Sequence, residues 1–216
     1  MFVKLWMKKD VVTVAHDQTL AEAEELMRRH GIRRLIVLGE EDTLVGIISR
    51  EDVRKGIPAS CDENTRKIAA ASKVEAYMTQ NPLTADPMDP LEDIALTMRR
   101  NKIGGMPVVE DGRVAGIITE SDIFQAFAEV LGAGRSGARV ELKIGQGGKD
   151  LLQIVKLCKQ FAVRVTAISI YQDFSPEHQL LTIRFDGEEL NDLIDALWQS
   201  GCQVNRVIRS DPGENG

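Results

Sequence analysis

One seven-residue phrase occurs twice in this chain of 216 residues, as GIISRED at residues 46–52 and as GIITESD at residues 116–122. It ends a longer repeat, in which residues 3–38 align with residues 74–109 at a constant shift of 71. A turn that is one residue shorter in the second copy reduces the shift to 70 before the phrase. An ordered repeat with a single gap predicts two copies of one supersecondary unit that pack against each other.

Each copy has the pattern of a short strand, a helix, two strands and a second helix. In the first copy, β-branched residues predict a strand at 12–14, and apolar residues at helical spacing predict a helix over 18–30 that stops at Gly31. The runs LIVL and LVGII, separated by an acidic turn, predict two strands. In the second copy we expect a helix over about Leu91–Asn101 and a last helix that starts at Asp122.

The repeated phrase combines groups that suit a ribose-phosphate. A strand ending at Ile118 and a helix beginning near Asp122 would expose backbone N–H groups at a helix N-terminus, which favours anions. The Thr119 hydroxyl can donate to a phosphate, and the Asp122 oxygens can accept from ribose hydroxyls. Gly116 would let the backbone approach a flat ring. The alternative is that Thr119 or Ser121 only caps the helix. Two copies of the phrase favour ligand binding.

The segments MTQNPLTAD and KIGGMPVVEDGRVAGIITESDIF, with their first-copy counterparts, resemble the cystathionine-β-synthase-type (CBS) domain family over about residues 1–131. The resemblance implies an adenine-nucleotide site in the cleft between the copies, with phosphate and ribose held by the hydroxyl-x-x-Asp phrase. By position, the residues that it assigns to the site are Ser49, Asp52, Thr119 and Asp122 from the phrases, Thr13 and Thr84 from the first strands, and Arg33, Arg34, Gly104 and Gly105 from the segments before the second strands.

The two copies differ in that last segment. Arginines suit phosphate oxygens through bidentate hydrogen bonds, whereas glycines allow a base to pack against the backbone. We therefore expect the base to contact Gly104–Pro107 while Arg33 or Arg34 reaches the phosphate. The alternative for the arginines is a solvated surface. Pro107 has Ile36 as its first-copy counterpart, which makes the first-copy site differ from the family pattern.

A third module follows the glycine-rich stretch at 132–137. Alternating and helical patterns predict strands at 138–144, 163–171, 179–185 and 203–208, and helices at 149–160 and 188–199. The order βαββαβ is ferredoxin-like and resembles an ACT domain, a fold that often binds amino acids and pairs into dimers. The family's ligand loop corresponds to residues 145–150, with Gly145, Gly147 and Gly148, but its aspartate and proline are missing. The alternative is a module used only for pairing.

The predicted protein is therefore an α/β (α+β) chain, with a tandem CBS-domain pair followed by a ferredoxin-like ACT-type domain. The order CBS–CBS–ACT resembles the acetoin-utilization accessory proteins of bacteria, which implies a stand-alone regulator. The predicted organisation is CBS domain 1 at 1–60, a linker at 61–73, CBS domain 2 at 74–131, a linker at 132–137, the ACT-like domain at 138–210 and a disordered tail at 211–216.

Composition narrows the function further. A formal net charge of -6 with 5% aromatic residues argues against a nucleic-acid or anionic-membrane partner, and no apolar run approaches the roughly 20 residues of a membrane span. Three widely spaced cysteines (Cys61, Cys158 and Cys202) suggest reduced thiols in the cytoplasm. The histidines (His16, His30 and His178) do not cluster, and of these only His16 is expected near the cleft.

Catalytic motifs are also missing from the sequence. We therefore expect a nucleotide-sensing regulator, with Mg²⁺ arriving only with a di- or triphosphate, and we expect a homodimer with an unidentified enzyme as partner. Two other hypotheses are kept: an oligomerisation module without a nucleotide, and an enzyme, which would reveal itself by turnover of the bound nucleotide.

Overall fold

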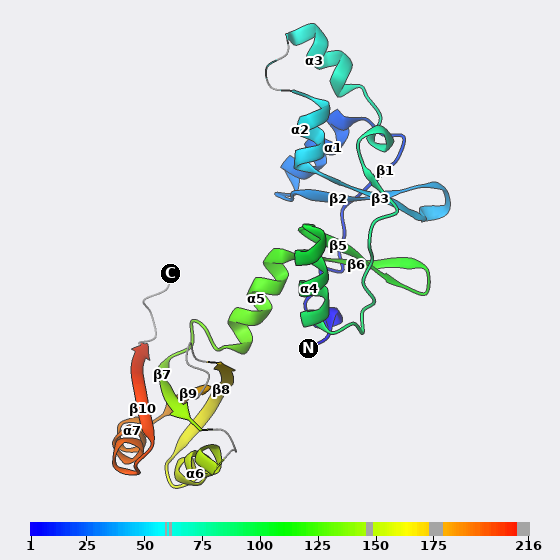
Figure 1. Ribbon diagram of the computed structural model, residues 1–216. Helices are drawn as coiled ribbons and strands as arrows, with labels where there is room; N and C mark the ends of the chain where they lie inside the picture. The colour runs from blue at the N-terminus through cyan, green and yellow to red at the C-terminus, as the bar shows by residue number, and fades with distance from the viewer. Residues whose placement is uncertain (59, 61, 146–148, 173–178, 211–216) are drawn as a thin grey trace. The chain divides into compact units, whose positions relative to one another are not determined.

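The computed structural model of the chain describes residues 1–58, 60, 62–145, 149–172 and 179–210. Backbone contacts divide the chain into two compact units, Met1–Gln125 (unit 1) and Ala126–Gly216 (unit 2). Unit 1 holds both copies of the repeat, and unit 2 holds the third module (Figure 1). Each unit is described by itself.

The first repeat is a small sheet with helices packed on it. Thr19 caps the first helix, because its hydroxyl accepts from the Glu22 N–H while the Glu22 carboxylate accepts from the Thr19 N–H. After the helix, Gly31 takes a left-handed φ of 63°, a conformation that glycine adopts readily. The elements are β1 (Thr13–Ala15), α1 (Leu20–Arg29), β2 (Arg34–Leu38), the 3₁₀ turn Glu40–Asp42, β3 (Leu44–Ser49) and α2 (Arg50–Gly56).

The second repeat has the same plan. Its first helix covers the predicted span, and the helix ends at Lys102, the counterpart of Gly31, which takes a left-handed φ of 55° without being glycine. The last helix begins at Glu120, two residues before the predicted start. The elements are α4 (Leu91–Asn101), β5 (Gly105–Glu110), β6 (Arg113–Thr119) and α5 (Glu120–Val130).

The two repeats exchange their leading segments. Lys8 and Ile117 exchange two backbone hydrogen bonds of 2.9 Å each, so the N-terminal segment of the first repeat pairs with β6 of the second. In the same way, β4 (Thr79–Gln80), which precedes the second repeat, pairs antiparallel with β3 of the first repeat. Two 3₁₀ turns, Val3–Leu5 and Val74–Ala76, precede the exchanged residues. Neither repeat therefore completes its sheet from its own residues.

Each exchanged segment also contributes a buried side chain to the core of unit 1. Val3 and Val74, which are equivalent in the repeat, are both fully buried. The Val3 N–H donates to the Asp89 carbonyl at 3.1 Å, and the Val74 N–H donates to the Gln18 carbonyl at 2.8 Å. Because each leading segment is held by the opposite repeat, we treat unit 1 as one folding unit.

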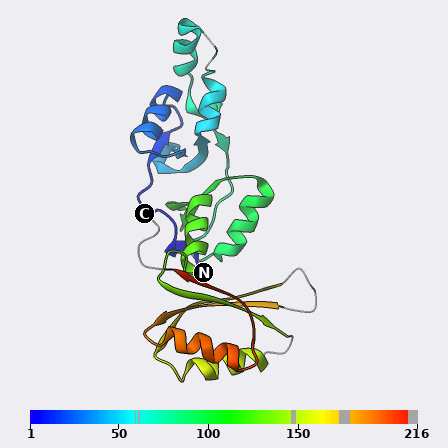
Figure 2. The same cartoon turned by 90° about the vertical axis from the view of Figure 1, so that its left-hand side faces the viewer.

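Unit 2 is a four-stranded antiparallel sheet with two helices on one face. The strand order is β10-β7-β9-β8, which confirms the predicted ferredoxin-like βαββαβ order. Figure 2 shows both helices on the same side of the sheet, where their apolar faces cover Val140, Ile183 and Phe185. Membership of the ACT family stays a prediction. The elements are β7 (Gly137–Ile144), α6 (Lys149–Cys158), β8 (Val163–Gln172), β9 (Gln179–Gly187), α7 (Leu190–Gln199) and β10 (Gln203–Ser210).

Parts of the two predicted linkers belong to regular elements. The predicted linker 61–73 contains a helix, α3 (Glu63–Ala70), because the Asp62 carboxylate accepts from the N–H groups of Asn64 and Thr65 at 3.0 Å each. The predicted linker 132–137 ends at Gly137, which already belongs to β7. The predicted disordered tail 211–216 lies outside the described residues. No helix in the described part of the chain is long and apolar enough to cross a membrane.

Candidate functional site

Both phrases place a hydroxyl at the end of a strand and an aspartate in the first turn of the next helix. Between β3 and α2, the Ser49 hydroxyl and N–H donate to Asp52 Oδ2 at 2.6 and 2.9 Å, and the Asp52 N–H donates to Ser49 Oγ at 3.2 Å. Thr119 and Asp122 make the same three bonds between β6 and α5. The phrase therefore does cap each helix, and the cap uses only the Oδ2 oxygen of each aspartate.

The second oxygens of the two aspartates have different surroundings. Asp52 Oδ1 lies 3.7 Å from Lys55 Nζ on the same helix, and 23% of the Asp52 side chain is exposed. Asp122 Oδ1 lies 3.8 Å from Lys8 Nζ, and 6% of its side chain is exposed. Lys8 belongs to the exchanged N-terminal segment. Asp52 is thus accessible to a ligand hydroxyl, whereas Asp122 is covered.

Two clefts within unit 1 follow one plan. Each is walled by the phrase of one repeat, the residues that lead into the other repeat, and the loop before the other repeat's second strand. The Ser49 cleft is lined by Arg34, Ile47, Ser49, Asp52, Thr79, Asn81, Pro82, Leu83, Asn101, Lys102, Ile103, Gly104 and Gly105. The Thr119 cleft is lined by Lys8, Asp10, Val11, Val12, Gly31, Ile32, Arg33, Arg34, Ile117, Thr119 and Ser121.

The Ser49 cleft has the dimensions of a small-molecule site. Its volume is ≈ 410 Å³, within the range of roughly 300–1,000 Å³ that is usual for ligand pockets. Apolar surface comes from Ile47, Leu83 and Ile103, and polar groups come from Asp52 and Asn81. Apolar walls with a few convergent polar groups are typical of sites for small organic ligands.

The Thr119 cleft is smaller and more basic. Its volume is ≈ 220 Å³, and its charged lining consists of Lys8, Arg33 and Arg34 against Asp10. Arg33 Nη2 donates to Ser121 Oγ at 3.4 Å, so that arginine is directed across the cleft to the start of α5. This cleft offers an anion more positive charge than the Ser49 cleft does.

Arg34 lies where the two clefts meet. Its side chain covers the glycine pair of the second repeat: a Cβ placed on Gly105 would lie 3.1 Å from Arg34 Cδ, and one on Gly104 would overlap the guanidinium. Burial lowers the pKa of Arg34 and the nearby Arg33 lowers it further, while Glu120 and Asp52 act in the opposite direction. Among the described residues, Arg34 has no hydrogen-bond or ion-pair partner.

The arginine and glycine segments share the Ser49 cleft through Arg34, which lines it together with Gly104 and Gly105. Arg33 lines only the Thr119 cleft, whereas Arg34 lines both clefts. Of the two arginines expected beside the glycine segment, Arg34 therefore lies there and Arg33 does not. Pro107 is buried within β5, where its carbonyl accepts from the Ala85 N–H at 2.9 Å, and it lines neither cleft.

Four other predicted contacts are placed elsewhere. Thr84 is exposed and lines neither cleft, and Thr13 borders a separate hollow with Leu38 and Arg113. In the sequence, each threonine comes directly after a residue that lines a cleft, Val12 in one case and Leu83 in the other. Gly116 faces the exchanged segment instead of a ring, since a Cβ there would lie 2.7 Å from the Lys8 carbonyl oxygen. His16 Nδ1 pairs with Glu75 Oε2 at 3.0 Å and lines neither cleft.

Several lining residues were missed by the sequence reasoning. Lys8, Asp10, Asn81 and Leu83 all belong to the segments that lead into each repeat, and these segments were assigned no role. A signal did exist, because the shift of 71 places Asp10 on Asn81 and Val12 on Leu83. What the repeat alone does not reveal is that each leading segment crosses to the opposite copy.

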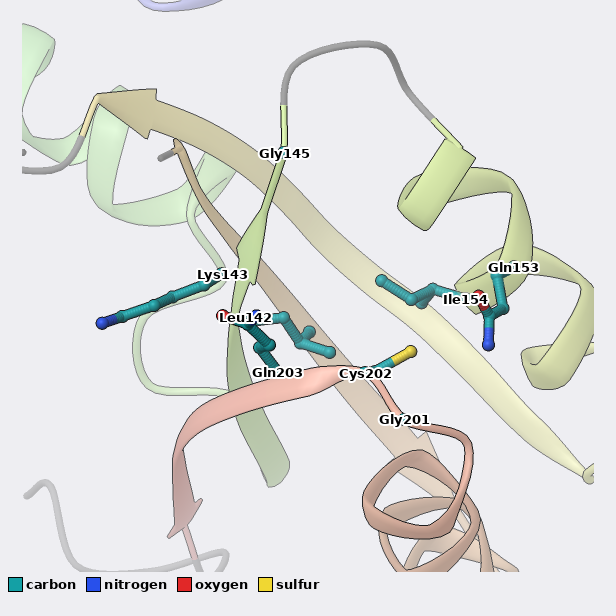
Figure 3. Close-up of a pocket in the computed structure, with 8 residues that line it drawn as sticks. All are labelled: Leu142, Lys143, Gly145, Gln153, Ile154, Gly201, Cys202 and Gln203. Atoms are coloured by element: carbon teal, nitrogen blue, oxygen red, sulfur yellow. The ribbon is translucent and has the colours of Figure 1, made fainter. Parts of the chain in front are cut away.

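Unit 2 has a hollow of its own next to the loop for which the ACT resemblance implies amino-acid binding. Its volume is ≈ 260 Å³, and it includes Gly145, while Gly147 and Gly148 lie outside the described residues. Figure 3 shows the Cys202 side chain directed toward α6, whereas the Lys143 ammonium extends to the opposite side. The Gln153 amide donates to the Ser200 carbonyl at 3.0 Å.

The described residues contain no cluster of three or more His, Cys, Asp or Glu side chains that could hold a metal ion.

The similarity of this chain to known proteins lies in the two repeats. The CBS domain model matches residues 3–59 and 74–129. A CBS domain-containing protein of Dictyostelium discoideum is 32% identical over 137 residues, which are 61% of this chain and 94% of that protein. An L-aspartate semialdehyde sulfurtransferase of Methanocaldococcus jannaschii is 33% identical over 126 residues, which are 58% of this chain but 23% of that enzyme.

Solved structures share the fold of these repeats. The CBS domain pair of protein MJ0100, in complex with 5′-methylthioadenosine and S-adenosyl-L-methionine, is 33% identical with a TM-score of 0.52, and the match covers 60% of this chain and 97% of that pair. A Vibrio cholerae protein assigned to acetoin utilization is 26% identical with a TM-score of 0.53, covering 61% of this chain and 93% of that one.

Proposed function

This chain belongs to the CBS domain family, and we propose that unit 1 is a regulatory module that binds an adenosyl ligand, with the Ser49 cleft as the principal site. The observation that carries the proposal is the accessible Asp52 carboxylate, whose Oδ1 is not used by the helix cap. A ribose presents two adjacent hydroxyl donors, and a fixed carboxylate oxygen is a suitable acceptor for them.

The remaining walls suit the rest of such a ligand. Ile47, Leu83 and Ile103 offer apolar contact to an adenine ring. The Asn81 amide can donate to a ring nitrogen and accept from the exocyclic amino group of adenine. Arg34 and Lys102 provide positive charge for a phosphate. This arrangement favours AMP, ADP or ATP over adenosine alone, with Mg²⁺ arriving with a di- or triphosphate.

The solved CBS domain pair that holds 5′-methylthioadenosine and S-adenosyl-L-methionine supports an adenosyl ligand, because both molecules contain adenosine. A ligand that contacts both repeats favours the closed arrangement in proportion to its differential affinity. The readout would be the activity of an enzyme partner rather than chemistry in this chain. We place the protein in the cytoplasm, where the free thiols of Cys158 and Cys202 stay reduced.

Calorimetric titration tests the site. Wild-type protein is titrated with AMP, ATP, S-adenosyl-L-methionine and 5′-methylthioadenosine, and the best ligand is repeated on Asp52→Asn. The asparagine oxygen still accepts from Ser49, but the amide that faces the ligand donates instead of accepting. We expect roughly tenfold to hundredfold weaker binding, the range for a hydrogen bond to a charged group.

Glu51→Gln is the matched control, because Glu51 is an exposed neighbour on the same helix, and its affinity should equal that of the wild type. No saturable binding of any adenosyl compound by the wild type would reject the proposal. Equal affinity of the wild type and Asp52→Asn would move the ligand out of the Ser49 cleft. Amino acids added to the same panel test the hollow beside Gly145, where binding stays a prediction.

A second role, self-association through unit 2, is favoured by the sheet edge at β8. This edge strand carries Val165, Ile168 and Ile170 with 46%, 50% and 46% of their surfaces exposed. An exposed apolar edge tends to pair with another strand, and the same strand of a second copy would give a homodimer. Sedimentation should show a dimer that Ile168→Lys dissociates, and a monomeric wild type would exclude this role.

A further inference from the structure

The two clefts of unit 1 share one side chain. Arg34 is the residue that lines both the Ser49 cleft and the Thr119 cleft. Its repeat counterpart is Gly105, so the second repeat contributes no equivalent cation. Two clefts built on one plan therefore have a single guanidinium between them.

The glycine pair of the second repeat makes the sharing sterically feasible. Gly104 and Gly105 leave the space that the Arg34 side chain fills, since side chains on these residues would meet Arg34 Cδ and its guanidinium. The arginine of the first copy thus packs directly on the glycines of the second copy. This explains the asymmetry between the segments RR and GG in physical terms.

The electrostatic surroundings leave Arg34 available to a ligand. Within the described part of the chain, its guanidinium has no hydrogen-bond or ion-pair partner, although it is half-buried. Arg33 repels it, while Glu120 and Asp52 attract it, and the Glu120 carboxylate lies beside Gly104 as the guanidinium does. A half-buried cation without a partner is costly, so an anion that enters either cleft gains a strong interaction with it.

We infer, on the premise of the proposed function, that Arg34 couples the two clefts and makes the binding of two phosphorylated adenosyl ligands anticooperative. A phosphate in one cleft draws the guanidinium to itself. A phosphate entering the other cleft then meets a neutralised Arg34 and a nearby negative charge. A ligand without a phosphate forms no ion pair with Arg34, so two such ligands bind independently.

A cycle of variants measures this coupling separately from the intrinsic difference between the clefts. The dissociation constant of AMP for the Thr119 cleft is measured twice, once as the second step in the wild type and once in Asp52→Asn, where the Ser49 cleft is impaired. We expect the second step of the wild type to be weaker by roughly tenfold or more, the worth of one charge-assisted hydrogen bond. The same comparison in an Arg34→Gln background should give a ratio near one.

Each outcome has a defined meaning. A ratio near one with Arg34 present would overturn the coupling but leave the proposed function standing. One AMP per wild-type chain supports the coupling only if Asp52→Asn still binds one AMP, and loss of all binding in that variant overturns it. No adenosyl ligand bound anywhere would remove the proposed function itself. If Arg34→Gln does not fold, 5′-methylthioadenosine on the wild type replaces it, and a coupled second step with that ligand would refute the role of phosphate.

Discussion

Gly116 is the position at which one added methyl group tests the exchange of leading segments most directly. A Cβ on Gly116 would lie 2.7 Å from the Lys8 carbonyl oxygen and 3.0 Å from Met7 Sδ. The backbone oxygen cannot move away without breaking the two 2.9 Å hydrogen bonds between Lys8 and Ile117. Gly116→Ala should therefore either strain unit 1 or detach its N-terminal segment.

The cost follows from those two routes. Overpacking of this kind costs about 1–3 kcal/mol, and each lost backbone hydrogen bond costs about 0.5–1.5 kcal/mol. Because the two routes are alternatives of similar cost, we expect a loss of about 1–3 kcal/mol in the free energy of unfolding of unit 1. For a unit of this size, about 4 °C per kcal/mol translates this into a fall of roughly 4–12 °C in Tm. Scanning calorimetry should show the fall in the unit 1 transition, with the unit 2 transition unchanged.

Gly46 provides the matched comparison, because it occupies the equivalent position against the other crossing segment. There a Cβ would first meet the flexible Met78 side chain, and the Thr79 carbonyl oxygen is farther away, at 3.0 Å. Gly46→Ala should therefore cost less than Gly116→Ala, and its cost should shrink in a Met78→Ala background. An unchanged unit 1 transition in Gly116→Ala would refute the crossing of the N-terminal segment.

Other predictions concern caps and charge. Ser49→Ala removes the 2.6 Å hydrogen bond to Asp52 and should cost about 1 kcal/mol in the free energy of unfolding, measured by urea titration. In unit 2, the Tyr171 hydroxyl is the main cause that lowers the pKa of Glu141 below 4.5. The stability that this carboxylate adds is present above its unfolded pKa and is lost as the pH falls through its folded pKa. Glu141→Gln should therefore reduce the loss of unit 2 stability at acid pH. An unchanged dependence of unit 2 stability on pH would contradict this prediction. Asp62→Ala should fray α3, seen as faster amide exchange there, without lowering the unit 1 transition.

The repeat made most of unit 1 predictable, because periodicity and caps are local properties. The helix Leu91–Asn101 has its predicted bounds, and the hydroxyl-to-aspartate caps have the expected residues. Which copy lies against which is a property of the tertiary fold, and equivalence under a shift of 71 cannot decide it. For this reason the sequence did not decide whether Arg33 or Arg34 lies beside Gly104, and in the structure Arg34 does, whereas Arg33 lines the other cleft.

The different surroundings of the two aspartates could not be predicted from the sequence either. From the sequence, Asp52 and Asp122 are equivalent in position, although Lys55, three residues after Asp52, has Gln125 as its counterpart. The difference is made by Lys8, more than one hundred residues earlier, which reaches Asp122 through the exchanged segment. In unit 2, by contrast, alternation and helical spacing were sufficient, since a βαββαβ chain of this length has few ways to bury its apolar face.

The exchanged N-terminal segment also imposes an order on biosynthesis. Met7 and Lys8 are synthesised more than one hundred residues before their pairing partner around Ile117. At elongation rates of 5–20 residues per second, the segment waits roughly 5–20 s for its strand. The first repeat receives its own closing strand, Thr79–Gln80, well before that. The start of the chain is therefore one of the last parts of unit 1 to find its place, and during that interval it is available to chaperones and proteases.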